Sequence, residues 1–281
     1  MKSWTPEKLK LGIQSEYYKK MKKYFVIGNP IEHSLSPKLH NHWFKQNNIN
    51  ALYDKKKVSE TDLERIISEV KTGKVDGINV TVPFKKSVIP FLDELTSLAD
   101  KTQSVNTIFK KKNKVIGDNT DVEGFERGLK HINYDVKNKK VFILGAGGVV
   151  PSIILALKNQ GTSKIILSNR TETKARDLKK IYPDLEIIGW GENTNFDMII
   201  NATSLGLKSD DQIQLDFSKT GSDKLFYDVI YNPHRTNFLL KGVELGNKIE
   251  NGKMMFIYQA QLAFKIWHNI LPKIDNKLLD E

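Results

Sequence analysis

The stretch KKVFILGAGGVVPSIILALKNQGTSKIILSNRT, residues 139–171, decides the fold, because it predicts a strand, a glycine turn, a helix and a second strand in succession. Residues 141–144 form a continuous apolar run, which is typical of a parallel strand buried on both faces. Pro151 suits the first turn of the helix, where its missing N–H costs little, and Gly161 ends that helix. Residues 164–168 are the second strand. This order is the one that opens a nucleotide-binding α/β fold.

The turn Gly145-Ala146-Gly147-Gly148 predicts a phosphate site. Without side chains in the way, backbone N–H groups can approach a pyrophosphate, and the N-terminus of the following helix adds partial positive charge. The third glycine of the usual GxGxxG pattern is absent, because Val150 stands there. A tight turn without a ligand is the alternative interpretation.

The turn after the second strand, Asn169-Arg170-Thr171, indicates which dinucleotide is bound. An NAD-binding domain usually carries an acidic residue here for the ribose 2′-hydroxyl, and this turn has none. Arg170, with Lys174 close behind it, suits a 2′-phosphate. The sequence therefore favours NADP over NAD.

Composition limits the class of protein. The 281 residues suffice for two domains, and no stretch approaches the ~18 apolar residues of a membrane span, so a cytoplasmic protein without membrane contact is expected. The absence of cysteine excludes disulfides, thiolate metal sites and a cysteine nucleophile. The six histidines lack metal-ligand spacing, so no metal is expected. The formal charge is +11, but the lysines are scattered in short runs, so no nucleic acid is expected as a partner.

Two hydroxyls stand on one turn near the N-terminus, in Ser34-Leu35-Ser36-Pro37, after a short apolar strand. Such a pair can hold a small hydroxylated or carboxylated molecule. Alternatively, Ser34 is a plain turn residue, and Ser36 is a helix N-cap with Pro37 as the first helical residue.

The segment NVTVPFK, residues 79–85, presents polar side chains at the end of a strand. Period-two alternation turns Asn79 and Thr81 to the same side. Lys85 follows at the rim, where a lysine can exchange protons with a ligand. A solvated charge is the alternative interpretation of Lys85.

Residues 104–117 predict a hairpin across Lys112-Asn113, which leads to Thr120 and Asp121. Either of these residues is a suitable N-cap for the next helix, and a capping aspartate can also face a cleft. The last helix, expected over residues 255–270, is apolar nearly all round. Gln259 on that helix is either a paired core amide or a ligand contact.

Two later apolar runs, residues 196–200 and 224–231, lead to Thr203 and to Val229 and Tyr231. In open parallel sheets, ligands bind beyond the carboxyl ends of the strands. Turn chemistry explains the glycine and proline residues near these strand ends, but not Tyr231.

Taken together, SLSP, NVTVPFK, SVNT, GDNTD, GAGG, NRT, NATSLG, DVIYNP and the late glutamine occur in the order seen in shikimate dehydrogenases, which the chain resembles from residue 24 onward. The resemblance implies NADP(H)-dependent interconversion of 3-dehydroshikimate and shikimate, on the pathway to aromatic amino acids. It also implies a two-domain α/β fold with a cleft between the domains. The expected parts are an extension (residues 1–20), an α/β substrate-binding domain (21–120), a Rossmann-type NADP-binding domain (121–253) and a C-terminal helix that returns to the first domain (254–281).

The resemblance also implies a role for each candidate site residue. Lys85 and Asp121 are the expected catalytic pair. The expected substrate contacts are Ser34, Ser36 and Tyr231 on the carboxylate side, and Asn79, Thr81, Asn106, Asp121 and Gln259 at the ring hydroxyls. The expected cofactor contacts are Gly145, Ala146, Gly147, Gly148, Val149, Asn169, Arg170, Thr171, Lys174, Thr203, Val229 and Met254. Met254 stands where the family often has glycine near the nicotinamide.

Three other functions are compatible with parts of the sequence. A quinate dehydrogenase differs by one substrate hydroxyl, which this sequence does not resolve. A catalytically silent NADP sensor would not need both Lys85 and Asp121, and a nucleic-acid binder would show salt-sensitive binding. The small-molecule substrate is the expected partner, and a homodimer is compatible with the sequence.

Overall fold

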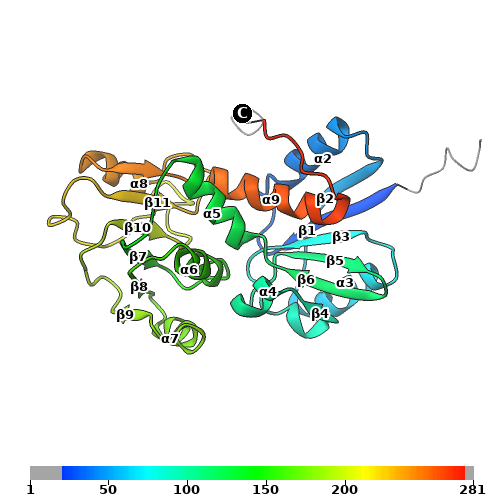
Figure 1. The fold of residues 1–281 in the computed structure, drawn as a ribbon, viewed down its shortest axis with the longest axis horizontal. Coiled ribbons are helices and arrows are strands. Elements are labelled where there is room, and N and C mark those ends of the chain that lie inside the picture. Colours follow the sequence, from blue (N-terminus) through cyan, green and yellow to red (C-terminus); the bar gives the residue numbers. More distant parts are fainter. Residues whose placement is uncertain (1–20, 276–281) are drawn as a thin grey trace, which may run out of the picture.

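The structure is a computed structural model that describes residues 21–275 of the 281. Two six-stranded sheets, each covered by helices, form two lobes that lie side by side (Figure 1). We call the lobe built on the N-terminal sheet the first lobe and the other the second lobe. This arrangement confirms the predicted two-domain α/β fold. The predicted extension, residues 1–20, lies outside the described residues.

The first sheet is mixed. Across the sheet the strands are β2 (Ala51–Lys57), β1 (Lys22–Gly28), β3 (Gly77–Val80), β5 (Thr107–Lys111), β6 (Lys114–Asp118) and β4 (Glu94–Leu95). The first three are parallel, and β5 and β6 form an antiparallel hairpin, which confirms the predicted hairpin across Lys112-Asn113. Because β3 and β5 are antiparallel, Asn79 near the end of β3 lies opposite Thr107 at the start of β5.

Helices cover both faces of the first sheet. They are α2 (Ser36–Gln46), the 3-10 turn η1 (Glu60–Asp62), α3 (Leu63–Lys71), the 3-10 turn η2 (Ile89–Phe91) and α4 (Ser97–Thr102). Side chains of β1 alternate between the two layers, as a strand requires. Tyr24 and Val26 pack in an apolar cluster with α2, whereas Ile27 packs on the opposite face in a cluster with α3.

The start of α2 differs from the prediction. Ser36 is itself helical, and Leu35 is the N-cap, with no side chain capping the helix. Ser36 is buried, and its side chain lies close to the hydroxyl of Tyr53 on β2. The predicted cap is therefore wrong, because the helix already includes Ser36 and its hydroxyl does not cap the first turn.

The second sheet is entirely parallel. Its strands, in order, are β12 (Lys248–Glu250), β11 (Leu225–Asp228), β10 (Met198–Asn201), β7 (Lys140–Leu144), β8 (Lys164–Ser168) and β9 (Glu186–Ile188). The strands predicted on either side of the glycine turn are confirmed as β7 and β8. The order reverses between β7 and β10, and such a switch point leaves a crevice at the carboxyl ends of the strands.

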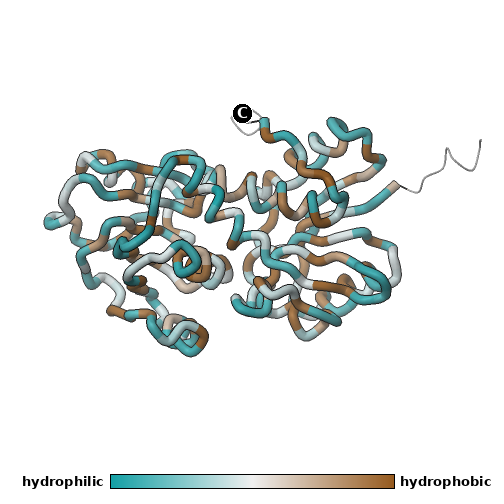
Figure 2. Tube along the Cα trace, viewed as in Figure 1, coloured by the Kyte–Doolittle hydropathy of each residue, from teal (hydrophilic) through white to brown (hydrophobic). Residues whose placement is uncertain are grey.

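Helices on both faces bury this sheet. They are α5 (Asp121–His131), α6 (Val150–Asn159), α7 (Glu172–Ile181) and α8 (Asn237–Glu244). Val141 and Ile143 of β7 pack with α5 and α6, and Phe142 packs in a second cluster with α8. Figure 2 shows hydrophobic segments along the central strands of each lobe and hydrophilic ones on the outer loops.

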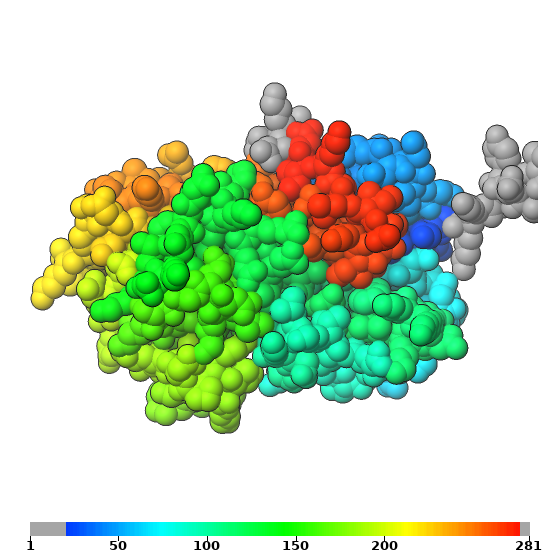
Figure 3. Space-filling view, viewed as in Figure 1, coloured from blue at the N-terminus to red at the C-terminus, as the bar shows by residue number. Residues whose placement is uncertain are grey.

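The last helix, α9 (Lys253–His268), contacts both lobes. Ile257 and Phe264 pack in the cluster of β1 and α2, whereas Met255 belongs to the core of the second lobe. A side chain at Gly124 of α5 would place Cβ 2.8 Å from Cβ of Gln259, so this glycine allows α5 and α9 to approach closely. The C-terminal segment lies against the N-terminal segments in the space-filling view (Figure 3). The predicted return of this helix to the first lobe is confirmed.

Candidate active site

A buried ion pair lies at the junction of the lobes. Lys85 Nζ is 2.5 Å from Asp121 Oδ2, and the two side chains are 10% and 7% exposed. Lys85 stands in the turn after β3, and Asp121 is the first residue of α5, where the helix N-terminus favours a negative charge. Thr120 occupies the N-cap position, but its side chain makes no capping bond. The sequence therefore predicted the start of α5, and the structure brings together the two residues that the resemblance to the family paired.

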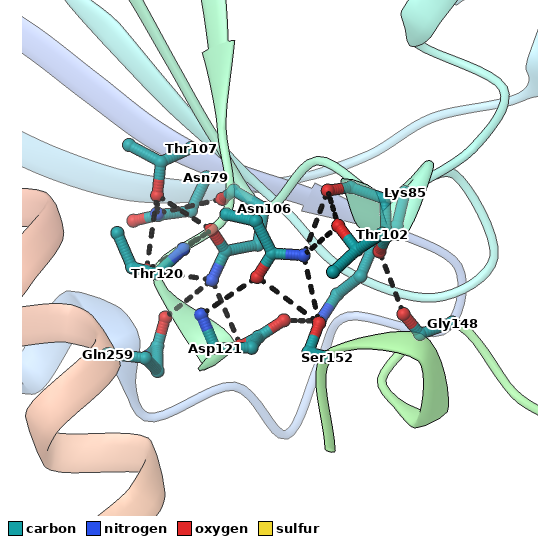
Figure 4. A network of polar contacts seen from close by, with 12 residues as sticks. Asn79, Lys85, Thr102, Asn106, Thr107, Thr120, Asp121, Gly148, Ser152 and Gln259 are labelled. Carbon is teal, nitrogen blue, oxygen red and sulfur yellow. Dashed lines mark hydrogen bonds and ion pairs between the residues drawn. The ribbon is translucent and has the colours of Figure 1, made fainter. Parts of the chain in front are cut away.

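Asn106 holds the other oxygen of this carboxylate. Its Nδ2 donates to Asp121 Oδ1 at 3.0 Å and to Gln259 Oε1 at 3.2 Å (Figure 4). Its Oδ1 accepts from the Thr120 backbone N–H at 2.8 Å. Gln259 comes from α9, so two distant segments, residues 120–121 and α9, fix one amide group and, through it, the orientation of the carboxylate.

Asn79 lies one strand away and is also fixed by hydrogen bonds. Its Nδ2 donates to the Asn106 carbonyl at 3.0 Å and to Thr107 Oγ1 at 3.1 Å, and its Oδ1 accepts from the Tyr53 hydroxyl at 2.7 Å. Burial raises the pKa of Tyr53 well above its ordinary value, so this phenol remains a donor. The row of polar side chains thus runs from Tyr53 to the ion pair.

The other predicted substrate contacts border this row. Ser34 Oγ accepts from the Ser36 backbone N–H at 3.3 Å. The Tyr231 hydroxyl lies close to the backbone N–H of Leu35, and the Tyr231 ring stacks on Phe256 with centroids 4.5 Å apart. Burial raises the pKa of Tyr231 to about 12. A tyrosine of the second lobe therefore reaches the serine turn of the first.

Thr81 follows β3 and is half-buried. Among residues 21–275, its hydroxyl has no hydrogen-bond partner, so it is available to a ligand. The backbone N–H of Thr81 donates to the Ile27 carbonyl at 2.9 Å, which fixes the position of the residue at the strand end.

The glycine turn lies next to the ion pair. Gly145 has φ +109°, and a Cβ there would lie 2.7 Å from the Ala202 carbonyl oxygen, so only glycine fits. Gly147 and Gly148 are exposed. A Cβ on Gly148 would lie 3.5 Å from Cδ of Lys85, so the lysine stem packs over the turn.

The N–H groups of residues 146–149 take no part in the hydrogen bonds of the described chain. They precede α6, whose N-terminus carries partial positive charge. Consecutive free N–H groups at such a place bind phosphate oxygens well. The turn, with Ala146 and Val149 half-buried at its two ends, therefore fits a pyrophosphate.

The second predicted cofactor segment is open to solvent. Arg170, Thr171 and Lys174 are exposed, and Asn169 is half-buried with its Nδ2 donating to the Thr171 carbonyl at 2.7 Å. Within the described residues, Arg170 and Lys174 make no ion pair, although other charged residues of α7 do. These two cationic side chains, which lie beyond the end of β8, therefore fit a 2′-phosphate.

The remaining predicted cofactor contacts are less accessible. The Thr203 hydroxyl donates to Asn201 Oδ1 at 2.7 Å, and Val229 is half-buried. Met254 is only 7% exposed and packs in the apolar cluster of β1 and α2. A cofactor contact for Met254 stays a prediction.

Sequence reasoning missed several residues of this network. Tyr53 contacts Asn79 but belongs to no quoted motif. Thr107, which also contacts Asn79, lies inside SVNT, and Asn119 lies inside GDNTD, but neither had an assigned role. The only signal for Tyr53 was an aromatic residue in a strand otherwise rich in lysine. Two cavities of about 280 and 540 Å³ lie elsewhere and touch none of the predicted site residues. No helix among residues 21–275 is long and apolar enough to cross a membrane.

Family models match both lobes. The model for the shikimate dehydrogenase substrate binding domain matches residues 26–108, and that for shikimate / quinate 5-dehydrogenase matches residues 127–206. An NADP(+) shikimate dehydrogenase of Pelagibacter ubique is 58% identical over 261 residues, which are 92% of this chain and 98% of the relative.

Solved structures agree with the architecture. Shikimate dehydrogenase from Aquifex aeolicus is 35% identical, with a TM-score of 0.84 over 93% of this chain and 97% of that chain. The enzyme from Thermus thermophilus, solved with NADP(H) and shikimate, is 28% identical, with a TM-score of 0.82 over 90% and 95%. The resemblance inferred from the motifs is thereby confirmed, and the chain belongs to the shikimate dehydrogenase family.

Proposed function

We propose that this chain catalyses the reversible, NADP(H)-dependent reduction of 3-dehydroshikimate to shikimate, a step in the biosynthesis of aromatic amino acids. The observation that carries the proposal is the position of the buried Lys85–Asp121 pair, whose lysine stem lies over Gly148 of the dinucleotide turn. A proton donor and a hydride donor can act on the same carbonyl group only if their sites adjoin in this way.

The residues of the second lobe fit NADP. The free N–H groups of residues 146–149 would hold the pyrophosphate, and Arg170 with Lys174, beside Asn169 and Thr171, would hold the 2′-phosphate. Thr203 and Val229, beyond β10 and β11, would border the nicotinamide. When bound, NADPH supplies the hydride for reduction of the carbonyl carbon, and NADP+ accepts it in the reverse direction.

The residues of the first lobe fit a ring with one carboxylate and several hydroxyls. Ser34 and Ser36, with Tyr231 opposite, would bind the carboxylate. Amide and hydroxyl groups next to the ion pair would bind the ring hydroxyls, since such groups both donate and accept hydrogen bonds. They are Asn79, Thr81, Asn106 and Gln259.

Lys85 is the proposed acid. As the substrate carbonyl is reduced, negative charge grows on its oxygen, and the Lys85 ammonium stabilises that charge and donates a proton. In the oxidation of shikimate, the same nitrogen receives the proton. Asp121, held by Asn106 at 3.0 Å, keeps the ammonium in place and accepts a hydrogen bond from the neighbouring hydroxyl.

Each of the two sheets belongs to a part of the chain with its own proposed binding function. We assign residues 21–120 to substrate binding, residues 121–253 to NADP binding, and the C-terminal part that contains α9 to packing on the first lobe. The mixed sheet, the parallel sheet and the packing of α9 support this division. Action in the cytoplasm as a homodimer stays a prediction.

The test is an assay of purified protein with NADP+ and either shikimate or quinate, followed by the absorbance of reduced nicotinamide. We expect turnover with shikimate, and a lower kcat/KM with quinate or with NAD+. Turnover with quinate alone would move the assignment to the sister activity. Binding of NADP+ without turnover of either substrate would favour a silent cofactor sensor.

A further inference from the structure

Two buried serines outside the proposed catalytic pair link the two lobes. Ser104 Oγ of the first lobe donates to the Gly148 carbonyl of the second at 2.9 Å, and Ser104 is 2% exposed. Ser152 on α6 is fully buried and exchanges hydrogen bonds with Asn119, at 2.9 Å from Nδ2 and 3.2 Å to Oδ1. Figure 4 shows Gly148 and Ser152 of the second lobe facing the polar network of the first.

The bond from Ser104 bears on the phosphate site. In a trans peptide, the carbonyl and the following N–H point in opposite directions. By holding the carbonyl of Gly148, Ser104 therefore fixes the N–H of Val149, one of the four consecutive N–H groups that have no partner among the described residues. A residue of the first lobe thus orients a phosphate-binding group of the second.

The bond from Ser152 bears on the catalytic pair. Asn119 is 1% exposed, and its Oδ1 also accepts from the Asp121 backbone N–H at 3.0 Å. Its Nδ2 donates to Thr102 Oγ1 and to the Ser104 carbonyl, both at 2.9 Å. One amide group therefore joins the start of α6, the segment of Ser104 and the backbone of the proposed catalytic aspartate.

A third contact supports the same junction. The Tyr182 hydroxyl, after α7, lies 3.0 Å from the Pro151 carbonyl and 3.4 Å from the Lys101 carbonyl of α4. The groups in these links are hydroxyls, amides and carbonyls, which bond only at short range and in defined directions. The links therefore hold only in one relative position of α4 and α6.

We propose that Ser104 and Ser152 are positioning residues that couple occupancy of the cofactor turn to the geometry of Lys85 and Asp121. The inference rests on the proposed function. Phosphates bound at residues 146–149 order the turn, and the two hydroxyls favour the arrangement in which the ion pair faces the cofactor. Substrate and cofactor then favour the same state, so each raises the affinity for the other.

The variants S104A, S152A and S104A/S152A test the coupling. The matched control is S163A, which removes an exposed hydroxyl that bonds to the Lys139 carbonyl within the second lobe at 2.8 Å. The dissociation constant of shikimate is measured with and without saturating NADPH, two ligands that do not react with each other. We expect NADPH to tighten shikimate binding about tenfold in the unmodified chain and S163A, and little in the double variant. We expect kcat to fall about tenfold in the double variant while both KM values change by less than about threefold.

Hydrogen exchange separates failure of this inference from failure of the proposed function, because it needs no turnover. We expect NADPH to slow amide exchange at residues 118–121 in the unmodified chain and in S163A, but not in S152A. Absence of turnover in the unmodified chain would refute the function, and this exchange experiment would still decide the coupling. Equal NADPH effects in the unmodified chain and S152A, or no effect in either, would overturn the inference. If the double variant does not fold, the single variants decide by the same criteria.

Discussion

Replacing Lys85 by alanine tests the proposed role of Lys85 as the proton donor of the active site. The substitution removes the ammonium 2.5 Å from Asp121 Oδ2 and leaves a carboxylate whose side chain is 7% exposed. Loss of a positioned acid lowers kcat by ~10²-fold or more. Loss of one partner of a buried pair also lowers the free energy of unfolding, by about 3–5 kcal/mol. Asn106 still donates to Asp121 Oδ1 at 3.0 Å, so we expect the loss of unfolding free energy to stay near the lower end of that range.

The double variant K85A/D121N separates the two effects. An amide in place of the carboxylate removes the unpaired buried charge, so we expect most of the lost stability to return while kcat stays ~10²-fold low. Urea unfolding gives the stability, and initial rates of shikimate oxidation give kcat. The control is Lys86→Ala, which removes the exposed neighbouring lysine and leaves kcat within about twofold.

Two results would contradict the roles given to Lys85 and Asp121. A Lys85→Ala variant that keeps about a third of the turnover would show that another group supplies the proton. A double variant no more stable than Lys85→Ala would show that the stability loss has a cause other than the unpaired carboxylate.

Three further predictions concern the cofactor, the substrate and acid stability. R170A/K174A should reduce the preference for NADP over NAD in kcat/KM by about tenfold or more, because it removes the two cationic side chains proposed to bind the 2′-phosphate. An unchanged ratio would show that these side chains do not bind the 2′-phosphate. Tyr53→Phe removes the donor to Asn79 Oδ1 at 2.7 Å, so the KM for shikimate should rise about threefold or more while the Kd for NADPH is unchanged; a changed NADPH affinity instead would contradict this placement. Burial lowers the pKa of His40 from 6.5 to about 3. Between these two pH values His40 is protonated in the unfolded chain but not in the folded chain. The contribution of His40 to the free energy of unfolding therefore falls by about 1.4 kcal/mol for each pH unit below about pH 6.5. His40→Phe should flatten urea-unfolding stability between about pH 6.5 and 4.5, and parallel curves for the two chains would exclude this contribution.

The second lobe could be predicted well because its signals are local. The apolar run before Gly145 and the run at Lys164–Ser168 are strands in the structure, and the latter has the predicted bounds. Strand burial on both faces leaves a continuous apolar pattern, and a positive φ at the turn requires glycine. Each of these constraints acts over a few residues, so it is visible in the sequence.

The contacts of the site depend on distant residues, which periodicity does not pair. Asn106 and Gln259, which share a hydrogen bond, are 153 positions apart, and Ser104 and Gly148 are 44 apart. The order of motifs implied which of these residues share a site, but not which atoms meet. Ser36 shows the limit of local rules, because a cap was predicted, whereas the helix already includes Ser36 and its side chain lies close to Tyr53 of another element.

The most direct test of the central claim is the structure of the chain with shikimate and NADPH, which do not react with each other. We expect Lys85 Nζ to lie within about 3.2 Å of the substrate oxygen that is bonded to the hydride-exchanging carbon, and Asp121 to remain bound to the same nitrogen. We also expect the nicotinamide to lie on the side of Gly148. A Lys85 side chain turned away from that oxygen in the bound complex would contradict the account.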